Sequence, residues 1–303
     1  MADCSQKRYE IFWIYDMIKK AGFPQCEKLG EINPMGLISN MFNYSKPGPG
    51  VDKEERQKRR FFLFFELFFR KFWKLIQLNL LYVLFWIPPL IAGTLLTPYN
   101  ATLAYLAFFL VGTFTAGPAT AGAVYILRNF ATQTPVFLLS DFFQQFKANY
   151  KQSALAFLFN SLALFACYAS YLFYGEYMDM GFLNYVFKAM VLIMALLVLF
   201  ETFHTFLMIV TVDLKLKDIF KNCFLFAILN LVRNFCSLLF AVGFLWLEYK
   251  FFPLSMFIFP FVGLVFPLFI ITFNAYPVVK KYAIDPYYEA QGEPKEDESI
   301  FED

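Results

Sequence analysis

GTFTAGPATAGAVYILRNF, residues 112–130, runs directly into ATQTPVFLLSDFFQQFKANYKQ, residues 131–152, and the rest of the chain is organised around these two segments. Its first part is apolar and rich in small residues, as a membrane helix is, but Gly117-Pro118 interrupts it. Proline removes a backbone hydrogen bond and bends a helix. The second part alternates aromatic with polar and basic residues and is too polar to stay in lipid. We therefore predict a kinked membrane helix that leads into an amphipathic elbow at the inner membrane surface.

The composition indicates an integral membrane protein. Of 303 residues, 59% are hydrophobic and 17% are charged, whereas about 25% are charged in ordinary soluble domains. The 43 phenylalanines exceed what one soluble core hides, and lipid is the natural place for them. More than half of the lysines and arginines lie in the first 74 residues. This asymmetry favours contact with anionic lipid, and no nucleic-acid-binding module is recognisable.

Six apolar stretches, each near the length of about 20 residues that a bilayer core demands, predict an all-α bundle of about six transmembrane helices. Pro88-Pro89 interrupts the first stretch and Gly117-Pro118 the second, and the last stretch contains three prolines. The expected spans are 75–96, 101–127, 153–174, 183–212, 224–247 and 251–276.

The connections between these spans differ in charge. Those after spans one, three and five contain a single basic residue, Lys250, whereas those after spans two and four contain three each. The basic N-terminus and Lys280-Lys281 belong with the second group. By the positive-inside rule, both chain ends are expected to be cytoplasmic. Residues 1–58 then form a cytoplasmic extension with one short amphipathic helix at Tyr9–Lys20, 59–282 the membrane domain, and 283–303 an acidic flexible tail.

The segment that precedes the first span, residues 59–74, is basic and rich in phenylalanine. Arg59, Glu66, Arg70 and Lys74 share one helical face, and phenylalanines occupy much of the remainder. Such a helix suits the lipid headgroup region. The same pattern fits the anchored inner end of the first membrane helix, and the two readings are compatible with one continuous helix.

Four motifs carry a resemblance to a known family. FFRKFWKLIQLNLLYVLFWIP (68–88), AGPATAGAVYILRNF (116–130), DFFQQFKANYKQ (141–152) and DLKLKDIFKNCFLFAILNLVRN (213–234) together resemble the YesL-like family of bacterial membrane proteins. The resemblance covers roughly residues 60–280, although residues 91–115 add much of a span that shorter members lack. It implies a multi-pass protein of the bacterial cell membrane, associated with carbohydrate uptake and transport systems, and it supplies no catalytic residues.

Small residues on one helical face, Gly112, Ala116, Ala119 and Ala123, suit the close approach of another helix. Alternatively, Pro118 marks a broken helix whose freed backbone groups line a transport site. The elbow at 141–151 has a second version at 218–224. Both are typical of interfacial helix starts, or of helices that dock a cytoplasmic partner such as the ATPase of a transporter. The EAA loop of sugar permeases is absent.

Polar residues at similar depth in different spans form the candidate ligand site. Glu201 and His204 are three residues apart in the fourth span and share a face. Arg233 in the fifth span lies at the depth of Glu201, so an intramembrane Glu201–Arg233 pair is expected, either as a substrate or proton site or as structural glue. Asn160 and Asn230 lie close to the same depth. With a single histidine in the chain, no metal site is expected at Glu201 and His204.

No catalytic motif is present. The chain has no phosphate-binding P-loop, no H-E-x-x-H and no G-x-S-x-G sequence, and its five cysteines form no C-x-x-C pair. We therefore expect no enzyme activity, no cofactor and no metal. The leading hypothesis is a transport-related or accessory protein of the cell membrane that works with a transporter or another membrane protein. The alternatives are a self-contained secondary transporter or channel, and a structural or membrane-sensing protein.

Overall fold

The computed structural model describes residues 60–176 and 181–286, all of which belong to one unit, Lys58–Asp303. Every regular element in these ranges is helical, which confirms the expected all-α membrane bundle. The predicted helix at Tyr9–Lys20, the rest of the N-terminal extension and most of the acidic tail lie outside the described residues.

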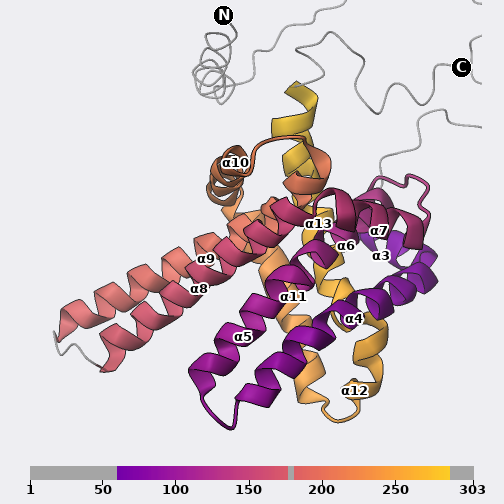
Figure 1. The fold of residues 1–303 in the computed structure, drawn as a ribbon. Helices are drawn as coiled ribbons and strands as arrows, with labels where there is room; N and C mark the ends of the chain where they lie inside the picture. Colours follow the sequence, from indigo (N-terminus) through magenta and orange to yellow (C-terminus); the bar gives the residue numbers. More distant parts are fainter. Residues whose placement is uncertain (1–59, 177–180, 287–303) are drawn as a thin grey trace, which may run out of the picture. The chain divides into compact units, whose positions relative to one another are not determined.

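The helices of the described ranges follow one another with short connections (Figure 1). They are α3 (Arg60–Arg70), α4 (Phe72–Leu96), α5 (Ala101–Phe114), α6 (Ala116–Ala131), α7 (Leu138–Ala148), α8 (Tyr150–Glu176), α9 (Phe182–Thr211), α10 (Leu216–Leu229), α11 (Leu231–Lys250), α12 (Ser255–Ile258), the π-helix η1 (Phe259–Gly263), α13 (Val265–Val279) and the π-helix η2 (Lys280–Ile284).

Five of these segments are long and apolar enough to cross a membrane: α4, α8, α9, α11 and the run Phe259–Ile284. The pair α5 and α6, bent by 49°, provides a sixth if it is counted as one span. The bend lies at Thr115, between the two helices. Pro118 sits in the first turn of α6, where its missing N–H leaves no hydrogen bond unmade. The chain therefore breaks just before the Gly-Pro pair, and α6 begins there as a new helix.

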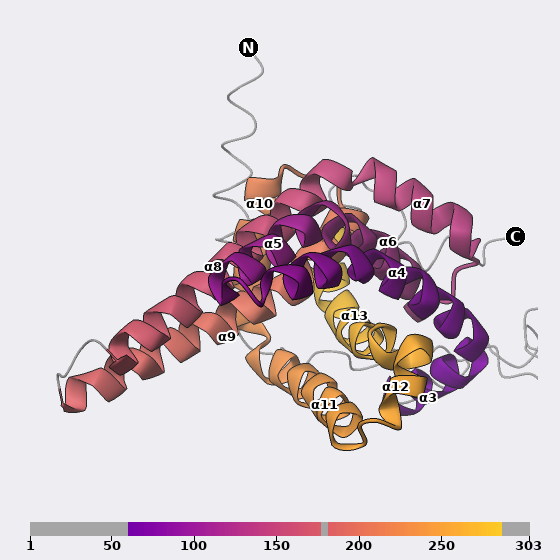
Figure 2. The same ribbon diagram turned by 60° about the horizontal axis from the view of Figure 1, so that its bottom comes forward.

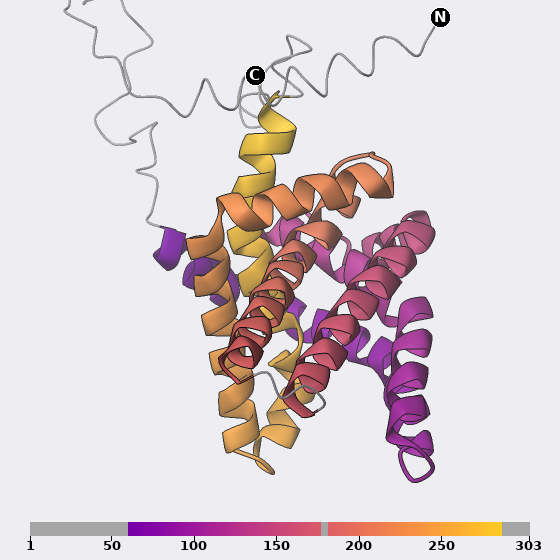
Figure 3. The ribbon, with the colours of Figure 1, turned by 90° about the vertical axis from the view of Figure 1, so that its left-hand side faces the viewer.

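Helix α6 lies in the interior and packs against α4, α7, α8, α9 and α13. Figure 3 shows α10, in orange, lying across the bundle in front of the yellow last helix. Most of its residues are buried, including Ala116, Ala119 and Ala123. The closest approaches occur at two glycines. A Cβ atom at Gly117 would lie 2.9 Å from the Cβ of Phe157, and one at Gly122 would lie 2.9 Å from the backbone oxygen of Phe142. Small residues thus let α8 and α7 approach the backbone of α6.

The last two spans differ from their expected bounds. Instead of one helix over 224–247, the chain forms α10 and α11, which are separated at Asn230. The apolar residues of α10 are explained by packing against α9, which hydropathy cannot distinguish from exposure to lipid. The last span runs from Phe259 to Ile284 rather than from 251 to 276, because residues 251–258 form a turn and the short helix α12.

The phenylalanine-rich helix α3 is separate from α4, since the backbone breaks at Lys71 (φ −103°, ψ 11°). One face of α3 packs against α13: the ring of Phe64 stacks on that of Phe269 with 5.0 Å between centroids. The Nη2 atom of Arg60 donates a hydrogen bond of 2.8 Å to the carbonyl oxygen of Phe273. Phe61, Phe62 and Phe69 remain exposed on the other side. The segment is therefore a separate helix, as the interfacial reading requires, and not part of one continuous helix with the first span. Its phenylalanines are divided between the contact with α13 and the exposed face.

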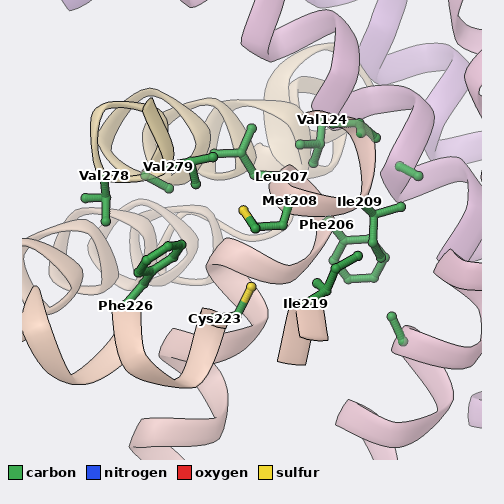
Figure 4. Close-up of a cluster of buried hydrophobic side chains, with 14 residues drawn as sticks. Val124, Phe206, Leu207, Met208, Ile209, Ile219, Cys223, Phe226, Val278 and Val279 are labelled. Atoms are coloured by element: carbon green, nitrogen blue, oxygen red, sulfur yellow. The ribbon is translucent and has the colours of Figure 1, made fainter. Parts of the chain in front are cut away.

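A hydrophobic core joins the end of α9 to α6, α10 and α13. In Figure 4, Cys223 and Phe226 of α10 point toward Met208 of α9 and Val278 of α13. Beyond this core, α8 and α9 continue as an antiparallel pair, and the end of α8 and the start of α9 project away from the other helices (Figure 1, Figure 2). The core therefore anchors one end of this hairpin.

The connections after α6 and α9 meet at one end of the bundle, which we call the basic end: residues 128–151, 212–221 and 280–281. The Nη1 atom of Arg128 donates a hydrogen bond of 3.1 Å to the carbonyl oxygen of Val210, at the end of α9. The Nε2 atom of Gln152 donates one of 2.9 Å to the carbonyl oxygen of Leu214. The two basic connections that the sequence assigns to one side thus lie side by side.

Replacing Arg128 by methionine is expected to lower the free energy of unfolding by about 1–2 kcal/mol. The substitution removes the charge-assisted hydrogen bond to Val210 and the guanidinium contact over the ring of Tyr125, 4.8 Å from its centroid. Denaturation of the purified protein in mixed micelles measures the loss. Lys147→Met, at an exposed basic residue of α7, is the control and should change the value by less than about 0.5 kcal/mol.

Asn79, a residue that the sequence does not single out, joins the first span to the last. Its Nδ2 atom donates to the carbonyl oxygens of Phe259 (3.0 Å) and Pro260 (2.6 Å). Its Oδ1 atom accepts from the backbone N–H groups of Leu264 (3.0 Å) and Val265 (2.8 Å). These groups lie in and directly after the π-helix η1, where the regular α-helical hydrogen-bond pattern is interrupted. The buried amide thus completes the broken helix.

Candidate functional site

The structure places the five predicted site residues unequally. Glu201 and His204 face inward from α9, and Asn160 faces inward from α8, all three deeply buried. Asn230 lies in the break between α10 and α11 and is partly buried. Arg233 of α11 is exposed. Three of the five residues are therefore buried, but only Glu201 and Asn160 line the same groove between α8 and α9, while His204 contacts α10 and α11.

Glu201, with an exposed fraction of 5%, is held by its own helix. The Oγ1 atom of Thr205, one turn later, donates to the carboxylate oxygen Oε1 of Glu201 and lies 3.0 Å from the Glu201 carbonyl oxygen. Asn160, with an exposed fraction of 6%, faces the carboxylate from α8. Its Nδ2 atom makes no regular hydrogen bond among the described residues. A buried acid therefore stands beside an unused amide donor.

His204 belongs to a second polar contact, directed toward α11. Its Nε2 atom lies 3.2 Å from the Oδ1 atom of Asn234, and its ring meets that of Phe226 edge-on with 5.9 Å between centroids. Asn234 in turn donates 3.3 Å to the carbonyl oxygen of Ala227. The Nδ1 atom of His204 is buried without a partner in the described part of the chain. Asn234, which no sequence pattern singles out, is thus the residue of α11 that contacts His204.

The expected Glu201–Arg233 ion pair is not formed among the described residues. Arg233 faces Arg60 instead: burial lowers the pKa of Arg60, and the nearby Arg233 lowers it further. The reason is the helix break at Asn230. It resets the phase of α11, so that Asn234 points inward while Arg233 points outward. Residue depth was therefore a poor guide to which side chains meet.

A groove of about 550 Å³ opens beside Glu201, between α8, α9 and α10. Its walls are mostly apolar, with Asn160 and Glu201 as the buried polar residues and Lys217 as the single basic one. Neither His204 nor Arg233 lines it. The lining residues are Phe159, Asn160, Ala163, Val198, Glu201, Leu216, Lys217, Phe220 and Phe224.

Behind the groove, Cys223 of α10 is close to the same acid. Burial raises the pKa of the Cys223 thiol well above its ordinary value, and the neighbouring Glu201 acts in the same direction. A thiol of this kind is a small apolar residue rather than a nucleophile. Within residues 60–176 and 181–286, no group of three or more histidine, cysteine or acidic side chains lies close enough to hold a metal ion.

Residues 75–171 match a family described as "protein of unknown function, DUF624". The match extends from α4 through most of α8. It therefore includes the bent pair α5 and α6, the elbow α7 and Asn160, and it ends before Glu201. No curated protein and no solved structure matches the chain.

Proposed function

We propose that this chain is a non-catalytic, transport-related protein of the cell membrane that acts as an accessory to an uptake system, with both chain ends in the cytoplasm. The chain resembles YesL-like proteins, which are associated with carbohydrate uptake, and this resemblance supports a carbohydrate as the substrate of the uptake system. The observation that carries the accessory role is the pair of short amphipathic helices, α7 and α10, at the basic end.

Helix α7 is fixed by one face and offers the other. Phe142 is fully buried against Gly122 of α6, and the Asp141 carboxylate accepts a hydrogen bond of 2.9 Å from the N–H of Phe137. Leu139, Phe143 and Lys147, spaced four residues apart, are exposed. The helix is fixed in position and exposes an aliphatic, an aromatic and a basic residue in one row. Such a row suits a partner protein whose groove receives the helix.

Helix α10 has the same organisation. Ile219, Cys223 and Phe226 are buried in the core beneath it, whereas Lys217, Lys221 and Phe224 are exposed. Arg128 and Gln152 join the connections that carry α7 and α10 through hydrogen bonds. The two helices are therefore held in a fixed position relative to each other. A cytoplasmic protein that engages both would bind with a fixed geometry, as the ATPase of a transporter requires.

The double substitution Phe143→Ser/Lys147→Glu is expected to reduce the recovery of transport components several-fold when the protein is captured in mild detergent from its native membranes. Quantitative mass spectrometry measures the recovery relative to the wild type. Tyr99→Ser, an exposed aromatic between α4 and α5, is the control and should recover wild-type amounts. The proposal is wrong if the wild type itself retains no transport or sugar-pathway protein.

A second candidate function, a self-contained secondary transporter, is favoured by one observation: Glu201 is a buried intramembrane acid beside a groove. Ionisable groups inside membranes are rare and mark substrate or proton pathways. This candidate requires that the purified protein alone, reconstituted in vesicles, move a substrate across the bilayer and lose that flux in Glu201→Gln.

A further inference from the structure

We propose that the groove between α8, α9 and α10 binds a lipophilic organic cation, with its positive charge at the Glu201 carboxylate and its apolar part between the phenylalanines. The ligand enters sideways from the bilayer. The inference concerns this groove alone and does not depend on the accessory role proposed above.

The first step of the argument is charge. Glu201 is buried, and no basic side chain forms an ion pair with it in the described ranges; Arg233, the expected partner, faces away. An ionised carboxylate in such a place is costly when it is unpaired, and a cation seated beside it offsets that cost. The groups that contact it from α8 and α9 are neutral donors, the Asn160 amide and the Thr205 hydroxyl. The Thr205 hydroxyl donates to the carboxylate, the Asn160 amide lies beside it, and neither supplies a positive charge, so a cation could come from the groove.

The second step is the chemistry of the walls. Phe159 and Phe220 meet edge-to-face with 6.1 Å between centroids, and Phe224 lies on the same side of α10, one turn further along. The faces of aromatic rings attract cations, and more strongly where water is excluded. Ala163, Val198 and Leu216 supply the aliphatic part of the wall. A small hydrophilic cation gains little from such walls, whereas a cation that carries aromatic or aliphatic substituents fills them.

The third step is access. Phe159 and Phe224, at the rim of the groove, are 52% and 42% exposed. The rim is therefore open to the surroundings of the protein. Phe159 is on a membrane-spanning helix. A ligand that partitions into the bilayer therefore reaches Glu201 without crossing the interior of the bundle.

The fourth step is the other charge that faces the groove. Lys217, at the basic-end rim, is the one further charged side chain of the lining. For a cationic ligand, Lys217 is a weak repulsive neighbour and Glu201 an attractive one. For an anionic ligand, the two roles are exchanged. The substitutions Glu201→Gln and Lys217→Gln therefore predict opposite outcomes for the two ligand classes.

Equilibrium dialysis with radiolabelled tetraphenylphosphonium, using the full chain purified in detergent, tests the inference. Tetraphenylborate, an anion of nearly the same shape, serves as the matched ligand control. We expect the wild type to bind the phosphonium more tightly than the borate. Glu201→Gln should weaken phosphonium binding about tenfold, which corresponds to one lost charge contact of moderate strength. Lys217→Gln should leave phosphonium affinity unchanged or raise it.

Two further variants keep the result interpretable. Glu248→Gln, at a distant acid near the end of α11, should leave binding at the wild-type level. Ala163→Phe fills the groove from its lining while keeping Glu201, and should abolish binding even if Glu201→Gln fails to fold. Equal binding of phosphonium and borate, or phosphonium binding that survives both Glu201→Gln and Ala163→Phe, overturns the inference. So does borate binding that is lost in Lys217→Gln, which would assign the groove to an anion.

Discussion

Replacing Asn79 by leucine is expected to lower the free energy of unfolding by about 3–5 kcal/mol, the largest effect of any single substitution proposed for this chain. Leucine has nearly the shape of asparagine but makes no hydrogen bond. The change leaves two backbone carbonyls and two backbone N–H groups of the last span without their side-chain partner. A buried polar group that loses its partner costs about 1–3 kcal/mol, and the backbone hydrogen bonds that remain within η1 keep the sum below the cost of four lost partners.

Denaturation in mixed micelles gives the free energy, and hydrogen exchange by mass spectrometry locates the change. Exchange should rise at Leu264 and Val265, whose N–H groups lose their acceptor, and much less in α8 and α9. Leu80→Ala, at the adjacent residue on the exposed side of α4, is the matched control and should cost less than about 1 kcal/mol. If Asn79→Leu is as stable as Leu80→Ala, the hydrogen bonds of Asn79 do not stabilise the interrupted last span.

Replacing Gly122 by alanine is expected to cost about 1–3 kcal/mol, although alanine is ordinarily the better helix former. The added methyl group would lie 2.9 Å from the backbone oxygen of Phe142 and 3.0 Å from its ring. A backbone atom cannot turn aside as a long side chain does, so α6 and α7 must separate, and overpacking of this kind is destabilising. Loss of the α6–α7 contact should also expose Phe142.

The chain contains a matched control for this substitution. Gly243 lies in the middle of α11 with open space around its Cα, because nothing lies within 4 Å of an added Cβ. Gly243→Ala should stabilise the protein by about 0.5–1 kcal/mol through helix propensity alone. Thermal unfolding of the two variants should therefore shift in opposite directions. Shifts of the same sign would show that propensity, rather than close packing, governs the α6–α7 interface.

Much of the architecture could be predicted from the sequence because bilayer thickness imposes a simple rule on it. The spans near 153–174 and 183–212 correspond closely to α8 and α9, since both are long, apolar and free of proline. The bend beside Pro118 followed from proline chemistry. The division of 224–247 into α10 and α11 could not be predicted in this way. Packing against α9 and exposure to lipid select the same apolar residues.

The candidate site was less predictable than the fold. Glu201, His204 and Asn160 were found because polar residues within apolar runs are conspicuous. Pairing Glu201 with Arg233 failed because a one-residue break at Asn230 rotates α11, which depth along a helix does not reveal. Asn79 was missed for a different reason. Its partners are backbone groups some 180 residues later in the chain, and no local pattern marks them.

The contacts of Asn79 also have a consequence for biosynthesis. A bilayer contains no water to satisfy backbone groups, so the interruption at Phe259–Gly263 receives its additional hydrogen bonds from the amide of the first span. During synthesis that amide is inserted long before its partners leave the ribosome. The first and the final crossings are therefore finished as one late event, and a chain that ends before Phe259 keeps an unmatched amide in its first helix.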